Sequence, residues 1–496
     1  MSLTLTYSCA LHGLDAPAVT VETHISNGLP GFNMVGLAEM TVRESKDRVR
    51  SALQNAGFDF PQRRITLNLA PADLPKEGSR FDLAIAIGIL SASKQLPQHC
   101  AAHYLLLGEL SLDGSLRPIR GVMSAALACQ QSGQTLIVPS HNQHEAAMVP
   151  GISCLRADHL SQVCAHLSGD DSLSPCQLST RETTTCTLDM AEVIGQATAK
   201  RGCEIAAAGG HNLLLFGAPG TGKSLLAQRF RTILPPPTDA DCLEVAAIYS
   251  LMGLPQPYGE RPFHAPHHSA SAVALCGGGS DPKPGAISLA HHGVLFLDEL
   301  PEFQRHSIEM LREPLENGEI HIARAKRIIC YPARFQLIAA MNPCPCGYYG
   351  SNQHPCRCSL EQVQRYRAKI SGPMLDRIDL HVGMDGDAVD LFEDNHDNES
   401  SAQIAQRVAD ARERQYDRQG CSNARLSPNQ LKDLLQRAPK ARDYLNQAMQ
   451  TLGLSPRGAH RAIRVAQSCA DLGARPIALE DLQEALSLRQ FSLTSA

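Results

Sequence analysis

The sequence predicts an α/β protein in which a parallel sheet covered by helices lies between an α+β region and an all-helical region. From about residue 188 to 385, short apolar runs alternate with helical patterns, which is typical of a parallel sheet with helices on both faces. The stretch before it mixes strand and helix patterns, and about the last hundred residues are helical, with Pro and Gly at the breaks. We therefore expect domains at 1–167, 188–395 and 396–496, with a linker at 168–187.

Composition excludes several classes of protein. The 496 residues carry a formal net charge of -5 and no Trp, so neither a broad basic field nor a large stacking platform for bases is expected. Positive charge confined to a pore or a loop remains compatible with nucleic acid. We expect no membrane span or secretory signal, and the 17 cysteines then indicate a reducing compartment. A cytoplasmic protein is the expectation.

The first domain has three clear local patterns. ITLNLAPADLP predicts a strand with an exit turn, and FDLAIAIGILSAS predicts a buried helix. YLLLGELSLDGSLRPI predicts two strands around a turn at Asp113–Gly114. The segment SGDDSLSPCQLSTRETTTCT is polar and lacks apolar periodicity, as in a linker.

HNLLLFGAPGTGKSLLAQRF predicts a strand, a glycine loop and the start of a helix, with the GxxxxGKS spacing of a phosphate-binding loop. The glycines let backbone N–H groups curl around a β-phosphate, and the helix adds its positive N-terminal end. Lys223 is expected to reach the β and γ oxygens, and Ser224 to ligate magnesium. The nucleotide loop comprises Gly217, Ala218, Pro219, Gly220, Thr221, Gly222, Lys223 and Ser224.

A pair of acids follows the apolar run of HHGVLFLDELPEF, at the carboxyl end of an expected buried strand. Asp298 is the candidate to hold magnesium through water, and Glu299 to orient and polarise the attacking water. Two surface acids after a core strand would be the alternative. With the phosphate loop upstream, we favour the catalytic interpretation.

Three further polar residues are candidates for contacting the γ-phosphate. Asn342 ends the apolar strand FQLIAAMNP. Arg377, in SGPMLDRIDL, is suited to reach the nucleotide of a neighbouring subunit, unless it only pairs with Asp376 or Asp379. Arg457 opens an amphipathic helix with Ser455 as its expected cap, and we predict that it binds the same phosphate in cis.

NPCPCGYYGSNQHPCRCSL places four cysteines in a CxC…CxC pattern within the insertion 344–358. Such clustering predicts a tetrahedral thiolate site for structural zinc, with unliganded or redox-active thiols as the alternative. The expected ligands are Cys344, Cys346, Cys356 and Cys358.

Two segments between these motifs are candidates for contacting DNA. IHIA and RIICY alternate like the strands of a hairpin after Asn317–Gly318, with Arg324, Lys326 and Arg327 at its tip. The tip is either a set of phosphate contacts or a solvated turn. Upstream, GERPFHAPHHSASAVALCGGG is expected to form a long polar loop whose histidines are structural or contact phosphate, since their spacing suits a metal poorly.

GAPGTGKS, RPFHAPHHSASAVALCGGG, GVLFLDELPEF, AAMNPCPCGYYG, RYRAKISGPMLDRIDL and SPRGAHRAIRVA together resemble the magnesium-chelatase-like AAA+ proteins. Within them the sequence resembles, over nearly its whole length, the bacterial competence protein ComM (YifB) family. The resemblance implies an ATP- and Mg²⁺-dependent hexameric ring with a C-terminal helical lid. It also implies a helicase acting on single-stranded or branched DNA, which promotes branch migration during recombination of incoming DNA in natural transformation. Recombination proteins would be its partners.

By the same likeness Gly195 and Gln196 lie beside the adenine, and a hairpin precedes the first γ-phosphate sensor. One departure is His264, where the resemblance leads us to expect arginine, so a DNA or phosphate contact at this position is in question.

Residues 1–167 resemble the Lon protease domain, which raises an ATP-dependent protease as a rival function. That chemistry needs a Ser activated by a Lys, but Arg80 falls at the serine position and Met123 at the lysine position. Ser79 is one place off and has no basic partner in this alignment. We therefore expect a non-proteolytic relative. A chelatase-type motor and an AAA+ chaperone acting on a protein partner remain as alternatives.

Overall fold

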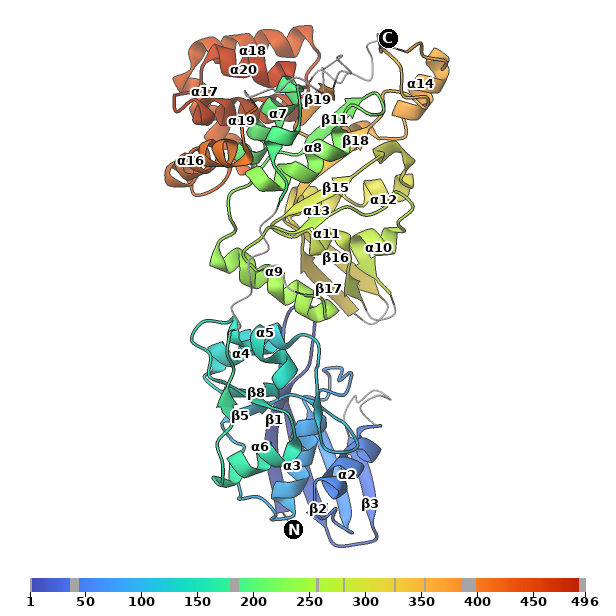
Figure 1. Ribbon diagram of the computed structural model, residues 1–496, viewed down its shortest axis with the longest axis vertical. Helices are drawn as coiled ribbons and strands as arrows, with labels where there is room; N and C mark the ends of the chain where they lie inside the picture. Colours follow the sequence, from blue (N-terminus) through green and yellow to red (C-terminus); the bar gives the residue numbers. More distant parts are fainter. Residues whose placement is uncertain are drawn as a thin grey trace. The chain divides into compact units, whose positions relative to one another are not determined.

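The chain divides into two units (Figure 1), in a computed structural model that describes residues 2–35, 44–178, 187–255, 258–279, 282–324, 327–351, 354–384 and 398–489. Unit 1 comprises Met1–Thr183 and Asp239–Tyr258, and unit 2 comprises Thr184–Thr238 and Gly259–Ala496. No helix in these described ranges is both long and apolar enough to cross a membrane.

Unit 1 is built on a mixed eight-stranded sheet. Its strands, in spatial order, are β10 (Ser174–Pro175), β9 (Cys154–Ala157), β8 (Thr135–Pro139), β5 (Tyr104–Leu106), β1 (Ser2–Cys9), β2 (Ala18–Ser26), β4 (Arg64–Ala70) and β3 (Gly31–Val35). The helices are α2 (Ser45–Asn55), α3 (Asp82–Ala92), α4 (Val122–Ser132), α5 (Gln143–Ala147), α6 (Leu160–Ser168) and α9 (Asp239–Met252).

The three local patterns predicted for this region are confirmed. β4 corresponds to ITLNLA, and every residue of α3 is buried, as expected of a helix that is apolar on all sides. The short strands β6 (Glu109–Leu110) and β7 (Leu116–Arg117) pair antiparallel across the Asp113–Gly114 turn. Gly114 has φ 92, a conformation that glycine adopts without strain.

Helix α9 interrupts the sequence of the central region, yet it packs in unit 1. The backbone N–H of Gly121 donates to Ser250 O (3.0 Å), and the Ser250 hydroxyl donates to the buried carboxylate of Glu145. Glu145 also accepts from the backbone N–H of Met123 (2.7 Å). The local sequence of 239–252 carries no information on which core this helix joins, and the structure assigns it to unit 1.

Unit 2 contains the predicted parallel sheet. Its order is β12 (Phe263–His264), β15 (Val294–Leu297), β18 (Gln336–Met341), β11 (Leu213–Gly217) and β19 (Leu380–Met384), with all neighbours parallel. Each of β11, β15 and β18 is a nearly continuous apolar run, because both faces of a parallel sheet are covered. The carboxyl ends of these three strands meet at one edge.

Helices cover this sheet and continue into a helical region at the C-terminus (Figure 1). Those within the central region are α7 (Ala197–Gly209), α8 (Lys223–Phe230), α10 (Ala272–Cys276), α11 (Ala286–Leu289), α12 (Arg305–Glu309), α13 (Arg312–Asn317), α14 (Leu360–Arg367) and α15 (Gly372–Leu375). The C-terminal ones are α16 (Ser401–Gln419), α17 (Pro428–Arg437), α18 (Pro439–Thr451), α19 (Pro456–Leu472) and α20 (Leu479–Ser487). The predicted α/β sheet and helical C-terminal region are therefore confirmed.

Candidate nucleotide and metal sites

The phosphate loop joins β11 to α8, as its sequence predicts. Gly222 is the N-cap of α8, and Lys223 is the first residue of that helix. Gly220 and Gly222 have φ 82 and 89, and a Cβ at either position would meet no atom within 4 Å. Gly217 has a different reason to be glycine, since a Cβ there would lie 2.3 Å from the carbonyl oxygen of Met384 on β19. The loop therefore combines left-handed backbone with a tight fit against the sheet.

Lys223 is buried and folds back onto its own loop. Its Nζ donates to the carbonyl oxygens of Gly217 and Ala218, at 2.8 Å each. Burial lowers the pKa of Lys223, while the charges of Asp298 and Glu299 act in the opposite direction. A cation held in this way is placed to exchange backbone carbonyls for phosphate oxygens.

Asp298 and Glu299 directly follow β15, and their side chains contact different groups. Ser224 Oγ donates to Asp298 Oδ2 (2.6 Å), so the two predicted magnesium ligands are in direct contact. Glu299 has a left-handed backbone (φ 51), and its N–H donates to Asp298 Oδ1 (2.9 Å). Its carboxylate Oε2 lies 3.1 Å from Nδ1 of His268, a neighbour that the sequence did not predict.

Asn342 follows β18, the strand between β11 and β15. The order of the strands therefore brings it to the same sheet edge as Lys223 and Asp298, although the three lie far apart in sequence.

Gly195 and Gln196, the residues expected beside the adenine, lie at the start of α7. Both have positive φ, 66 and 53, and Gln196 is the N-cap of the helix.

Arg377 precedes β19 and is buried against its own chain. Its Nη2 lies 2.6 Å from Glu316 Oε1, and its Nη1 donates to Pro373 O (2.7 Å). The expected alternatives were Asp376 and Asp379, so Glu316 is a partner that the sequence did not identify. Together with Glu309, Arg312 and His321, Arg377 and Glu316 line a cavity of about 360 Å³.

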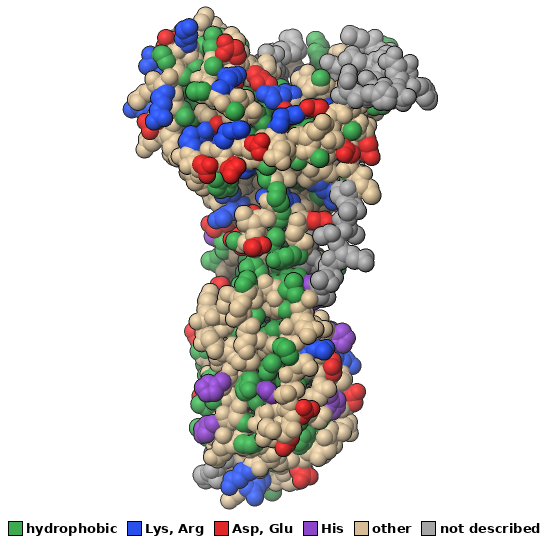
Figure 2. Space-filling view, turned by 60° about the vertical axis from the view of Figure 1, so that its left-hand side comes forward, with side chains coloured by type: hydrophobic (Ala, Val, Ile, Leu, Met, Phe, Trp, Pro, Cys, Tyr) green, Lys and Arg blue, Asp and Glu red, His purple; other side chains and the backbone are tan. Residues whose placement is uncertain are grey.

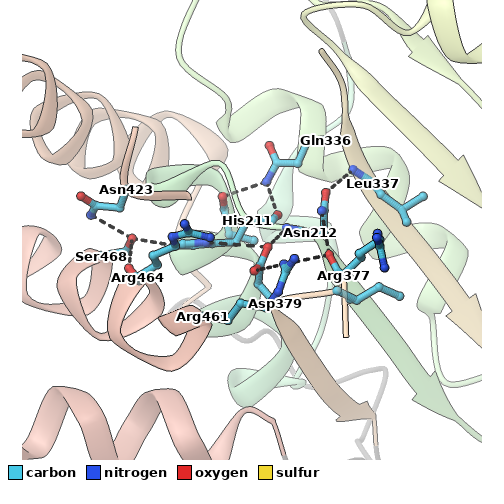
Figure 3. A network of polar contacts seen from close by, with 12 residues as sticks. His211, Asn212, Gln336, Leu337, Arg377, Asp379, Asn423, Arg461, Arg464 and Ser468 are labelled. Atoms are coloured by element: carbon cyan, nitrogen blue, oxygen red, sulfur yellow. Dashed lines mark hydrogen bonds and ion pairs between the residues drawn. The ribbon is translucent and has the colours of Figure 1, made fainter. Parts of the chain in front are cut away.

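Asp379 instead belongs to a buried network at the amino ends of the strands (Figure 3). It accepts from Arg461 Nη1 (2.6 Å) and from the backbone N–H of Asn212 (2.9 Å). Burial alone would raise the pKa of Asp379, but the charge of Arg461 helps to lower it below its ordinary value. Arg461 Nη1 also donates to the carbonyl oxygen of Arg377 (3.1 Å).

The same network joins the sheet to the C-terminal helices through His211. Its Nε2 lies 2.7 Å from Ser468 Oγ on α19, and Asn423 Nδ2 donates to that hydroxyl (3.0 Å). Burial lowers the pKa of His211 to about 4, so the ring is neutral at physiological pH.

Arg457 lies in the first turn of α19 and is exposed. Ser455 caps this helix as expected, its Oγ accepting from the backbone N–H of Gly458 (3.1 Å). Arg457 lies one helical turn before Arg461, the residue of α19 that takes part in the buried network.

The four cysteines of the insertion come together. Their sulfur atoms all lie within 4.8 Å of one another, and Cys344 is 3.4 Å from Cys346 and 3.7 Å from Cys356. Four zinc–sulfur bonds of about 2.3 Å in a tetrahedron would place the sulfurs about 3.8 Å apart. Backbone N–H groups of Tyr349 and Cys358 donate to the sulfurs of Cys344 and Cys356, at 3.3 and 3.4 Å. The cluster therefore fits a tetrahedral metal ion.

The basic segment forms the predicted hairpin. β16 (Glu319–Arg324) pairs antiparallel with β17 (Arg327–Pro332), and Arg324 is opposite Arg327 at the last rung. Lys326 lies outside the described residues, as do the side chains of Arg324 and Arg327. Gly318, with φ 74, ends α13 immediately before the hairpin.

The His-rich segment was predicted as a long polar loop, and this is only partly right. It contains the edge strand β12, which pairs with β15 through Phe263 and His264, and the helix α10. Phe263 and His264 are too short a stretch to indicate a strand from sequence, and their pairing with β15 makes them one. The rings of His267 and His268 lie 4.1 Å apart between centroids, tilted by 34°, and His268 also contacts Glu299.

Three parts of the chain match family models of magnesium chelatase subunit ChlI. A model of "Magnesium chelatase, subunit ChlI" matches residues 189–390, one of "Subunit ChlI of Mg-chelatase" matches 21–142, and one of the ChlI C-terminal part matches 398–489. An uncharacterized protein YifB of Salmonella typhimurium is 48% identical over 494 residues, covering 99% of this chain and 97% of the relative. Competence protein ComM of Haemophilus influenzae is 47% identical over 499 residues, with 99% and 98% covered.

The chain belongs to the ComM (YifB) family of magnesium-chelatase-like proteins. Family membership indicates an AAA+ ATPase that uses ATP and Mg²⁺ and assembles into oligomers. A weaker likeness connects it with Lon protease of Mycolicibacterium smegmatis, 27% identical over 149 residues, which is 28% of this chain and 19% of the protease.

Proposed function

We propose that the protein is an ATP-driven hexameric DNA motor. The observation that carries the ATPase part is the meeting of Lys223, the Ser224–Asp298 pair, Glu299 and Asn342 at one sheet edge. When bound, Mg²⁺ supplies charge stabilisation at the phosphates. Lys223 binds the β and γ oxygens, Ser224 and Asp298 hold the ion, and Glu299 orients the attacking water. Asn342 senses the γ-phosphate, and Gly195 with Gln196 lies beside the adenine.

The ring of six subunits is what the resemblance to the ComM (YifB) family implies, and two arginines would contact the nucleotides within it. Arg377 would stabilise the γ-phosphate of the next subunit, and Arg457 that of its own. For this, Arg377 must exchange Glu316 for phosphate, and the cavity that both residues line gives the side chain room to move. Arg461 of α19 donates to the carbonyl oxygen of Arg377, and Arg457 lies on the same helix. Helix α19 therefore connects Arg377 and Arg457.

We further propose that the substrate is single-stranded or branched DNA, moved by branch migration in recombination of incoming DNA during natural transformation. The Haemophilus influenzae relative is named as a competence protein, which supports this process. Recombination proteins would be partners in the cytoplasm. On the face shown in Figure 2, Lys and Arg side chains intermingle with Asp and Glu over the C-terminal helices. That face offers no single-sign field, and we propose that a local element, the β16–β17 hairpin, supplies the DNA contacts.

We also propose three functional parts: a Lon-like domain at 1–167, an AAA+ core at 188–395 and a helical lid at 396–496, with a linker at 168–187. The Lon-like part would be non-proteolytic. Arg80 is buried and donates to the carbonyl oxygen of Arg120, Met123 is buried, and Ser79 donates to Glu109. These contacts provide no lysine to activate a serine.

A structural zinc ion at Cys344, Cys346, Cys356 and Cys358 completes the proposal, on the basis of the sulfur spacing. Metal analysis of freshly purified, reduced protein should find about one zinc per chain. Redox-active thiols without a metal are the alternative, and protein free of zinc would favour them.

The DNA assignment is tested by replacing Arg324, Lys326 and Arg327 together with Ala. Basal ATPase should persist, whereas DNA stimulation and branch migration should vanish. The salt dependence of DNA binding should decrease by about one unit of slope per lost phosphate contact. Arg437, Lys440 and Arg442, all exposed on α17 and α18, give a control variant with the same loss of charge.

If the hairpin variant unwinds forked DNA as well as the parent, DNA does not run over this hairpin. An ATPase stimulated instead by unfolded protein or by a protoporphyrin-binding partner would favour the alternatives, an AAA+ chaperone or a chelatase-type motor.

A further inference from the structure

The cysteine loop touches the phosphate loop where Gly347 meets the ring of Pro219. A Cβ at position 347 would lie 2.5 Å from Pro219 Cδ and 2.6 Å from Cγ. Two non-bonded carbon atoms are best separated by about 3.5–4.0 Å, so no larger residue fits without displacing the proline. The two loops therefore meet without space to spare.

Pro219 is placed to transmit such a displacement to Lys223. Its ring fixes its own φ, so the ring cannot give way without moving the backbone. The preceding carbonyl, that of Ala218, accepts from Lys223 Nζ (2.8 Å) and from Thr221 Oγ1 (2.9 Å). A shift of Pro219 thus alters the carbonyl that holds the lysine in its place.

On the other side of the contact, Gly347 is fixed by the cysteines. It directly follows Cys346, and its N–H donates to the carbonyl oxygen of Cys344 (3.0 Å). The described part of the loop from 344 to 358 contains no helix or strand. Arg367 of α14 braces one end, where its Nε donates to Pro343 O (3.1 Å). Within the loop, the ring of Tyr348 meets that of His354 (centroids 5.0 Å apart), and the four clustered thiols join its two ends.

We infer that the four-cysteine metal site is a positioning device for the phosphate loop. With the ion bound, Gly347 is held against Pro219 and Lys223 is set for nucleotide. Without it the cysteine loop opens, the support of Pro219 is lost, and affinity for nucleoside triphosphate falls. The inference rests on the proposed zinc ion and nucleotide site, and it deepens them by connecting one to the other.

Two glycines of the same loop provide a matched test. Gly347 and Gly350 have similar backbone conformations, φ 86 and 78, but a Cβ at Gly350 would meet nothing within 4 Å. Gly347→Ala should raise both the KM for ATP and the Kd of a fluorescent ATP analogue roughly tenfold, with zinc retained. Gly350→Ala carries the same backbone strain and should leave both values near the parent's. Equal effects of the two substitutions would overturn the inference.

Adding Pro219→Ala to Gly347→Ala removes the ring atoms that clash, so affinity should recover relative to the single Gly347 variant. Removing zinc from the parent protein with a chelator should weaken binding of the analogue by a similar factor, and added Zn²⁺ should restore it. This arm needs no variant to fold. Unchanged nucleotide affinity in zinc-depleted protein would also overturn the inference. All measurements are made without DNA, so failure of the DNA-motor proposal would leave them unaffected.

Discussion

Polar side chains at the two ends of the strands in the unit 2 sheet differ in the kind of partners they have. At the amino ends, Asp379 has Arg461 and the backbone of Asn212 as partners, and His211 has Ser468 (Figure 3). At the carboxyl ends, Lys223 is held by two backbone carbonyls, and Glu299 is half exposed beside one histidine.

The difference distinguishes structural polar groups from groups available to a ligand. Asp379 and Arg461 bond to each other and to the backbone within the fold, and polar groups with such partners stabilise the fold and are not available to a ligand. Lys223 and Glu299 hold partners that a nucleotide can replace. If this distinction holds, substitutions at the amino ends should change the stability of the fold, and substitutions at the carboxyl ends should change ATP turnover.

The largest effect should follow from changing the carboxyl end. Lys223→Ala should abolish ATP hydrolysis, because it removes the positioned charge from the β and γ phosphates. Glu299→Gln keeps the shape of the side chain but loses water activation, so it should trap bound ATP and slow turnover by about 10²–10⁴. Steady-state ATPase and nucleotide retention measure both.

Glu302→Gln is the control, since Glu302 is an exposed acid three residues along that pairs with Lys369 (3.2 Å). Hydrolysis by Glu299→Gln at the parent rate would show that Glu299 has no catalytic role.

Arg377 lies at the amino end of β19, with its carbonyl in the network and its side chain on Glu316. Arg377→Ala should leave ATP binding intact but reduce hydrolysis by roughly 10³ or more, as for arginines supplied in trans. Mixing this variant with Lys223→Ala subunits should restore part of the activity, at interfaces that pair an intact arginine with an intact phosphate loop. Absence of recovery at every ratio would argue for a role within one subunit.

The amino end should govern stability. Asp379→Ala removes a buried carboxylate and leaves the partly buried Arg461 without it, which should lower the free energy of unfolding by about 3–5 kcal/mol. In the exposed pair of Arg442 with Asp443 (3.4 Å), Asp443→Ala should cost less than about 1 kcal/mol. Denaturant unfolding monitored by circular dichroism compares them. Similar losses would mean that the network is no more important than a surface ion pair.

The smallest predicted effect is on pH dependence. The pKa of His211 is about 4 in the fold against an ordinary 6.5, so between these values the unfolded chain takes up a proton that the folded chain does not. Neutral His211 therefore makes its full contribution to the free energy of unfolding above pH 6.5. That free energy falls by about 3 kcal/mol as the pH drops toward 4. The buried His381, with a pKa near 3, acts in the same direction.

His211→Gln should flatten this part of the stability profile, measured as the free energy of unfolding at a series of pH values. The same substitution at the exposed His267 should leave the profile as it is. A parent protein equally stable at pH 6.5 and 4.5 would contradict a neutral, buried His211.

The sequence by itself determined the local features of this protein. Spacing alone identified the phosphate loop, the strand before Asp298, the hairpin at 319–332 and the cysteine pairs, because each is set by neighbours in the chain. The family resemblance was likewise carried by contiguous segments, and the relatives confirm it.

Tertiary structure decided which groups meet across the chain. Only the strand order places β18 between β11 and β15 and so brings Asn342 to the edge that holds Lys223. The pairing of Arg377 with Glu316, the approach of His268 to Glu299 and the contact of Gly347 with Pro219 leave no periodic signal in the sequence. Helix α9 shows the same limit, since nothing in its local sequence specifies that it packs in unit 1.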